Sequence, residues 1–154
     1  AAVYAIERSR AEIFGALKNR FTYGTTGDRI RVEFWIDNDS TSTTAHQGEE
    51  LDHSSGNTLE ANVFVASGDP DRELESVRLL ASLDGAAFVE VNEWTSFDSG
   101  LVLDATGDSD LTLTAGTDYS TTADTMLYVQ VKCDRDESSE SYHEMAWSSP
   151  IRLY

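Results

Sequence analysis

Two of the three histidines lie close to two acidic residues in one polar segment of the sequence, residues 37–57. Imidazole and carboxylate groups are ligands of Zn²⁺, so His46, Glu49, Asp52 and His53 are candidates for a metal site. Their spacing matches no common zinc motif, and a polar loop would lose conformational entropy on forming a site. We therefore expect a solvated acidic loop, with a metal site on His46, Glu49 and His53 as the alternative.

A second group of acidic residues, in the segment "DATGDSD", could hold calcium through Asp104, Asp108 and Asp110. The motif "DND", which contains Asp37 and Asp39, begins like an EF-hand loop. It lacks the glycine and the distant glutamate that complete such a loop. Chance clusters of Asp are expected in so acidic a chain, and we interpret both groups in this way.

The aromatic and sulfur-containing residues offer two further candidate sites. Trp35, Trp94 and Trp147 could form a sugar-binding platform, although most tryptophans belong to a core or are covered by a neighbour. Cys133 is the only cysteine and alternates with Val129 and Val131, which predicts a buried, inert thiol. The sequence contains no Gly-x-Ser-x-Gly motif and no phosphate-binding loop with its lysine, so we predict no catalytic residue.

The charge of the chain excludes some partners. The formal net charge is −17, and Lys18 and Lys132 are the only lysines. A nucleic-acid-binding surface needs clustered basic residues, and anionic membranes repel so acidic a protein. We therefore expect no nucleic-acid or membrane partner. Dispersed acidic residues with almost no lysine favour a protein kept soluble in a high-salt cytoplasm, where salt screens self-repulsion; an ordinary acidic protein is the alternative.

The length and the N-terminus set the size of the unit. A chain of 154 residues suits one domain, and no apolar run approaches the ~20 residues that span a membrane. The opening segment "AAVYAIERSR" does not resemble a signal peptide. It also lacks an initiator methionine, so the chain could be a fragment.

One helix is predicted near the N-terminus, over residues 10–20. The segment "SRAE" from Ser9 to Glu12 has the form of a capping box, which starts a helix. Ile13, Phe14 and Leu17 follow at helical spacing, and we expect the helix to bury this stripe.

The rest of the sequence has the alternation of β-strands. Seven or eight strands are predicted, separated by turns and with no helix between them; the clearest are residues 30–36, 59–65, 77–83 and 127–133. Asp84–Gly85 has the composition of a tight hairpin turn, and Pro150 is expected at an edge or a bulge. The predicted fold is a mainly β, antiparallel sandwich, immunoglobulin-like or jelly-roll-like, preceded by one short helix.

The segment "SRAEIFGALKNRFTYGTTGDRI" resembles the start of the C-terminal region of the DUF3604 family. Further similar motifs follow in order along the chain: "QGEEL", "SGDPDRELESVRLL", "LYVQV" and "AWSSPI". The sequence departs from the family in its long Ser/Thr-rich loop before Gln47 and at Arg152.

This resemblance implies a location next to a PHP-type metallohydrolase barrel, whose metal-binding motifs would precede Ala1. It implies no metal ligand, cofactor or catalytic residue in this chain, and a divalent metal in the upstream domain. Residues 1–23 would then be the end of a barrel domain or a docking helix, and residues 24–154 the sandwich. The interdomain surface would include Ile13, Phe14 and Leu17.

Four residues would form the hinge between these two parts: Gly24, Thr25, Thr26 and Gly27. A sharp exit from the barrel can demand a positive φ, which glycine adopts freely. The two threonines could cap the chain locally or reach an active site on the neighbouring domain.

The function that follows from the resemblance is that of a non-catalytic accessory domain of a PHP-like metal-dependent hydrolase. Its partner would be the upstream catalytic domain of the same polypeptide, and weak homo-oligomerisation is a second use of the helix. The alternatives are a stand-alone carbohydrate- or protein-binding sandwich and an autonomous hydrolase with a loop metal.

Overall fold

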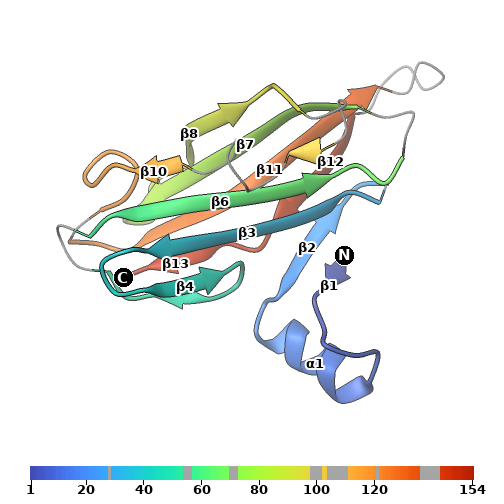
Figure 1. The fold of residues 1–154 in the computed structure, drawn as a ribbon, viewed down its shortest axis with the longest axis horizontal. Coiled ribbons are helices and arrows are strands. Elements are labelled where there is room, and N and C mark those ends of the chain that lie inside the picture. The colour runs from blue at the N-terminus through green and yellow to red at the C-terminus, as the bar shows by residue number, and fades with distance from the viewer. Residues whose placement is uncertain are drawn as a thin grey trace.

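The chain folds into two packed β-sheets and one short helix that lies outside them (Figure 1). The computed structural model describes residues 1–27, 29–53, 57–69, 73–97, 102–103, 111–120, 122–135 and 143–154. Within these residues there are thirteen strands and one helix, so the predicted mainly β sandwich with one helix is confirmed.

The larger sheet has eight strands. Its central strand is β11. One edge of β11 pairs with β7, which in turn pairs with β8. The other edge pairs with β12 along one part and with β13 along another; β2 and then β1 follow beyond β12, and β5 follows beyond β13. The strands are β1 (Ala2–Val3), β2 (Thr22–Thr25), β5 (Glu50–Leu51), β7 (Leu74–Leu83), β8 (Val89–Trp94), the central β11 (Thr125–Arg135), β12 (His143–Ser148) and β13 (Ile151–Leu153). Every pairing in this sheet is antiparallel except that of β13 with β5, which is parallel.

The smaller sheet has five strands in antiparallel pairs. Its order is β10–β6–β3–β4, with β9 also paired to β6. The strands are β3 (Arg31–Asn38), β4 (Thr43–His46), β6 (Leu59–Ala66), β9 (Val102–Leu103) and β10 (Leu111–Leu113).

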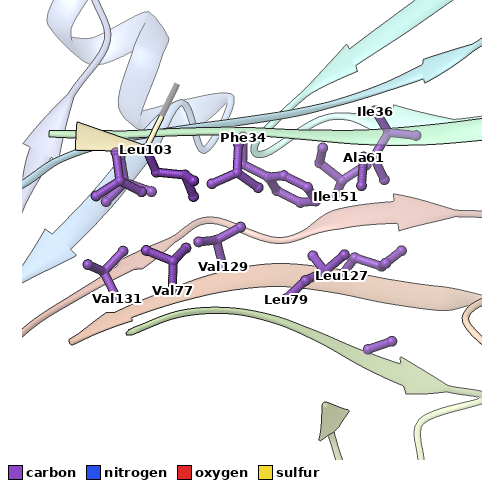
Figure 2. Close-up of a cluster of buried hydrophobic side chains, with 14 of the residues drawn as sticks. Phe34, Ile36, Ala61, Val77, Leu79, Leu103, Leu127, Val129, Val131 and Ile151 are labelled. Carbon is purple, nitrogen blue, oxygen red and sulfur yellow. The ribbon is translucent and has the colours of Figure 1, made fainter. Parts of the chain in front are cut away.

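The apolar residues that alternate along the long strands form the core between the sheets. Figure 2 shows Phe34, Ile36 and Ala61 of the smaller sheet facing Leu79, Leu127 and Val129 of the larger one. All six side chains are buried, as is that of Cys133. Successive side chains of a strand point to opposite faces, so a strand with one face toward the core alternates apolar and polar residues with a period of two. The sequence shows this period, and the strands could be predicted from it.

One turn and one bulge lie where the sequence predicts them. Asp84 and Gly85 have φ angles of 51° and 70° and form a tight turn, closed by a hydrogen bond from the N–H of Ala86 to the carbonyl of Leu83, in the connection between β7 and β8. Between β12 and β13, three residues (148–150) lie opposite two residues of β11 (128–129), which makes a bulge that contains Pro150.

Four short strands were missed. The predicted loop over residues 37–57 contains the end of β3, all of β4 and β5, and the N-terminal segment adds β1 and β2. These strands are two to four residues long apart from β3, so they carry too little alternation to be recognised. They exist because longer strands supply their hydrogen-bond partners.

Candidate functional site

The helix α1 spans Arg10–Lys18, close to the predicted 10–20. The hydroxyl of Ser9 accepts a hydrogen bond from the backbone N–H of Glu12 at 3.2 Å, as half of a capping box requires. At its other end the chain reverses through Arg20, which has a φ of 63°, and the N–H of Phe21 donates to the carbonyl of Ala16.

The apolar stripe of α1 is exposed, which corrects the expectation that the helix buries it. Phe14 is 67% exposed, Leu17 is 52% exposed and Ile13 is 37% exposed. Ala16 is the only buried residue of the helix. The reason is the position of the helix. α1 lies beyond β2, away from the long strands of both sheets (Figure 1), so the sandwich covers only the side of the helix that carries Ala16.

The helix is nevertheless held firmly at both ends. β1 and β2, which flank it, pair with each other, and the N–H of Tyr4 donates to the carbonyl of Phe21 at 2.9 Å. The Nε of Arg20 donates to the carbonyl of Gly48 at 3.0 Å. The structure therefore presents α1 as a fixed projection with an uncovered apolar face.

The predicted hinge from Gly24 to Gly27 begins as the end of a strand and lacks the positive φ that we expected of its glycines; its role as a hinge stays a prediction. Gly24 and Thr25 belong to β2, where they pair with Trp147 and Ala146 of β12. Neither Gly24 nor Gly27 has a φ in the left-handed region. The tertiary pairing with β12 extends this segment, because a strand partner satisfies its backbone groups.

Thr26, the residue after this strand, is exposed and forms hydrogen bonds with β12. The hydroxyl of Thr26 donates to the carboxylate of Glu144 at 2.8 Å and accepts from the N–H of Met145 at 2.9 Å. A Cβ added to Gly27 would lie 2.5 Å from the Glu144 carboxylate, so glycine leaves the room that this carboxylate occupies. The predicted division after residue 23 falls inside β2; the assignment of residues 1–23 and 24–154 to separate domains stays a prediction.

A cavity of about 500 Å³ lies where the N-terminal segment meets the edge of the smaller sheet. β4 pairs with β3 only from Trp35 onward. Before that point the edge of β3 is bonded by other groups: the hydroxyl of Tyr4 donates to the carbonyl of Val32, and the N–H of Gln47 donates to the carbonyl of Phe34. The lining residues are Tyr4, Phe21, Glu33, Phe34, Trp35, His46, Gln47 and Glu49.

Gln47 is the unusual member of this lining. It is only 3% exposed, and its Nε2 donates to the carbonyl of Thr22 at 3.1 Å. This contact fixes the amide orientation, because a carbonyl accepts from nitrogen and repels oxygen. The Oε1 atom is buried and has no hydrogen-bond partner among the described residues. Such an unpaired buried acceptor costs free energy of about 1–3 kcal/mol.

Burial raises the pKa of the Tyr4 hydroxyl strongly. The neighbouring Tyr23 and Glu33 raise this pKa further, against a smaller opposing effect of Arg31. The rings of Tyr4 and Tyr23 lie 5.4 Å apart, and burial also raises the pKa of Tyr23. The tyrosine is therefore neutral at physiological pH and serves as a hydrogen-bond donor.

The candidate metal ligands are divided between two places. The carboxylate of Glu49 accepts from the backbone N–H of His46 at 2.7 Å, whereas the ring of His53 lies between the carbonyls of Tyr154 and Ser120, at 3.0 and 2.7 Å. No group of three or more His, Cys, Asp or Glu side chains in the described part of the chain could hold a metal ion. Asp104, Asp108 and Asp110 lie outside the described residues.

The three tryptophans do not share one face. Trp35 lies on β3 of the smaller sheet and faces away from the core. Its Nε1 donates to Asp37 at 3.2 Å. Trp94 and Trp147 lie on β8 and β12 of the larger sheet, so a platform of all three does not form.

Comparison with protein families matches residues 1–63 of the chain. The family is DUF3604, a protein of unknown function. The match supports the sequence resemblance to DUF3604. The DUF3604-like segment includes α1, residues 24–27 and every residue that lines the cavity. Comparisons with curated proteins and with solved structures found no significant match.

Sequence reasoning missed this cavity, although it singled out several of its residues as candidates. Trp35 is a candidate residue of a sugar platform, and His46 and Glu49 are candidate metal ligands. The sequence does not indicate that all three line one cavity. Tyr4 and Phe21 come from a distant part of the sequence, and no periodicity links them to β3.

No helix in the described part of the chain is long and apolar enough to cross a membrane.

Proposed function

We propose that this chain is a non-catalytic accessory domain of a PHP-like metal-dependent hydrolase, and that α1 docks it onto the catalytic barrel of the same polypeptide. The observation that carries the proposal is the exposed stripe of Ile13, Phe14 and Leu17 on a helix fixed at both ends. The DUF3604 resemblance adds the expected partner, because in that picture the barrel precedes this helix.

The energetics favour a covered helix. A helix of nine residues is too short to persist alone in water, so its stability depends on tertiary contacts. Burial of Phe14 and Leu17 against a partner would stabilise the assembly by roughly 3–6 kcal/mol before the costs of association. In this proposal the divalent metal and the catalytic residues belong to the upstream domain, and the acidic surface adapts the protein to high salt.

The coding sequence before Ala1 provides the first test. A PHP-type domain with its histidine and acidic metal-binding motifs in frame supports the proposal. A stop codon or a signal peptide directly before this segment contradicts it, and favours the stand-alone binding module.

The second test uses Phe14→Asp and Leu17→Asp in the longer polypeptide and in this chain alone, with Val89→Asp as the control. Val89 is also exposed, at 53%, but lies on β8 of the larger sheet. In the longer polypeptide we expect hydrogen exchange of α1 to be slowed, and both helix variants to abolish this protection while Val89→Asp keeps it.

In the chain alone, the same helix variants should change the free energy of unfolding by no more than about 0.5 kcal/mol. A helix that exchanges equally fast in both polypeptides contradicts docking. A dimer of the chain alone that Phe14→Asp dissociates, measured by light scattering, shows that the stripe serves self-association instead.

A further inference from the structure

The cavity between Tyr4, Trp35 and Gln47 has an imbalance between hydrogen-bond donors and acceptors. Its side-chain donors are already engaged: the Tyr4 hydroxyl with Val32, Trp35 Nε1 with Asp37, and Gln47 Nε2 with Thr22. The ring of His46 is the exception, since it can donate or accept.

Backbone donors around the cavity are engaged as well. The N–H groups of Tyr4, Phe21, His46, Gln47 and Glu49 each donate to an oxygen of the protein. A ligand that brought only acceptors would therefore find few donors here.

The side-chain acceptors around the cavity are only partly engaged in hydrogen bonds. Glu49 uses one carboxylate oxygen for the N–H of His46, and Glu33 uses one for the guanidinium of Arg31. The second oxygen of each carboxylate has no hydrogen-bond partner among the described residues, nor has the buried Oε1 of Gln47. Two charged side chains with a vacant acceptor oxygen, Glu33 and Glu49, thus line one cavity, and the unpaired Oε1 of Gln47 is buried in its wall.

The rest of the lining is aromatic. Tyr4, Phe21 and Trp35 contribute rings from the N-terminal segment and from β3. Aromatic faces attract cations and also cover apolar carbon. The lining therefore suits a ligand with an apolar body and a positively charged, donor-rich head.

We infer that this cavity binds a primary ammonium group on an aliphatic arm, either from a free alkylamine or from a lysine side chain of another protein segment. An ammonium is a compact charge with three donors, which fits separate carboxylates on Glu33 and Glu49 better than the planar fork of a guanidinium, which matches a single carboxylate. The inference does not depend on α1 docking, because it concerns the cavity in this chain alone.

The experiment is an NMR titration of the ¹⁵N-labelled chain in dilute buffer with n-butylammonium chloride, with 1-butanol as the neutral probe of similar size. The signals of the Trp35 indole N–H and the Gln47 side-chain amide should shift and saturate with n-butylammonium. 1-Butanol should bind about tenfold more weakly, because a hydrogen bond to a charged group contributes roughly 1.5–3 kcal/mol. Equal affinities for the two probes would overturn the inference.

The variants Glu49→Gln and Glu33→Gln test the acceptors, and Glu73→Gln removes the same charge outside the cavity as the control. Glutamine at position 49 keeps an oxygen for the N–H of His46, so the local structure should survive. Either cavity variant should weaken n-butylammonium binding roughly tenfold, with binding to Glu73→Gln unchanged. Uniform weakening in all three variants would show only the effect of net charge and would overturn the site.

A third arm distinguishes the two sources of the ammonium group. The peptide acetyl-Gly-Lys-Gly-amide carries the same n-butylammonium group on a backbone. Tighter binding of the peptide than of n-butylammonium assigns the cavity to a lysine of another protein segment, and tighter binding of the free amine assigns it to a small metabolite. Absence of any shift at Trp35 and Gln47 with both probes would reject the inference.

Discussion

The buried backbone N–H of Val129 donates to the side-chain hydroxyl of Ser148 at 2.9 Å, at the bulge where β12 gives way to β13. A bulge disrupts the regular ladder, and Pro150 has no N–H to contribute to it. The serine hydroxyl supplies an acceptor at this point, so the central strand β11 has no unpaired donor at Val129.

Removal of this hydroxyl should destabilise the sandwich. Ser148→Ala leaves the N–H of Val129 buried without a partner, and we expect a loss of about 1–3 kcal/mol in the free energy of unfolding. Ser149→Ala is the matched control, because the Ser149 hydroxyl is only partly buried, in a bond to the hydroxyl of Thr22 at 2.8 Å. Urea denaturation measures both; an equal or larger loss for Ser149→Ala would contradict the role of Ser148.

Gly48 should tolerate no side chain. It has a φ of +95°, and a Cβ on it would lie 2.3 Å from the carbonyl oxygen of Arg20. Gly85 also has a positive φ, of +70°, but has no atom within 4 Å of an added Cβ. Gly85→Ala should therefore cost only the backbone strain, roughly 1–3 kcal/mol, and Gly48→Ala should cost more. Thermal melts that rank the two variants in the opposite order would argue against the close approach of Arg20.

Stability should fall at alkaline pH because of Tyr4. Its pKa is raised in the folded state by burial, so folding favours the neutral phenol. The resulting stabilisation is complete below the unfolded pKa of about 10 and is lost as pH rises toward the folded pKa. Tyr4→Phe should reduce the slope of stability against pH above about 10, measured by urea denaturation. Burial also raises the pKa of Tyr23 and Tyr119, so part of the slope should remain; an unchanged slope in Tyr4→Phe would contradict the assignment.

The chain should be more stable in molar salt than in dilute buffer. Its net charge of −17 makes the folded chain repel itself, and the screening length falls from about 10 Å at 0.1 M salt to about 3 Å at 1 M. The melting temperature should therefore rise through a potassium chloride series. A variant with several exposed glutamates changed to glutamine serves as the control and should respond less. A flat or falling melting temperature in the parent chain would count against adaptation to salt.

The chain alone should not hydrolyse phosphoesters in the presence of manganese or zinc. The described residues contain no cluster of three metal ligands, and His53 is engaged by two backbone carbonyls. A colorimetric assay with a generic phosphoester substrate measures this. Turnover that disappears in both His46→Ala and His53→Ala would show that the loop histidines act in catalysis, contrary to the proposed accessory role.

The long strands and the class of fold follow from local patterns in the sequence. Val32 and Phe34, or Val129 and Val131, alternate with polar residues because one face of each strand meets the core. This pattern is local, and so is the capping of α1 by Ser9. Local patterns of this kind can be found without knowledge of which strands pair.

Features that depend on residues far apart in the sequence could not be predicted, because they arise from long-range pairing in the folded chain. The short strands β1, β2 and β5 form because longer strands offer them partners, and Gly24 and Thr25 are extended because β12 lies beside them. Ile13, Phe14 and Leu17 have the spacing of a buried stripe, yet the sandwich leaves them exposed, since spacing shows that a face is apolar and not what covers it. The cavity likewise joins Tyr4 to Trp35 and Gln47 through long-range pairing, and no spacing in the chain could place them together.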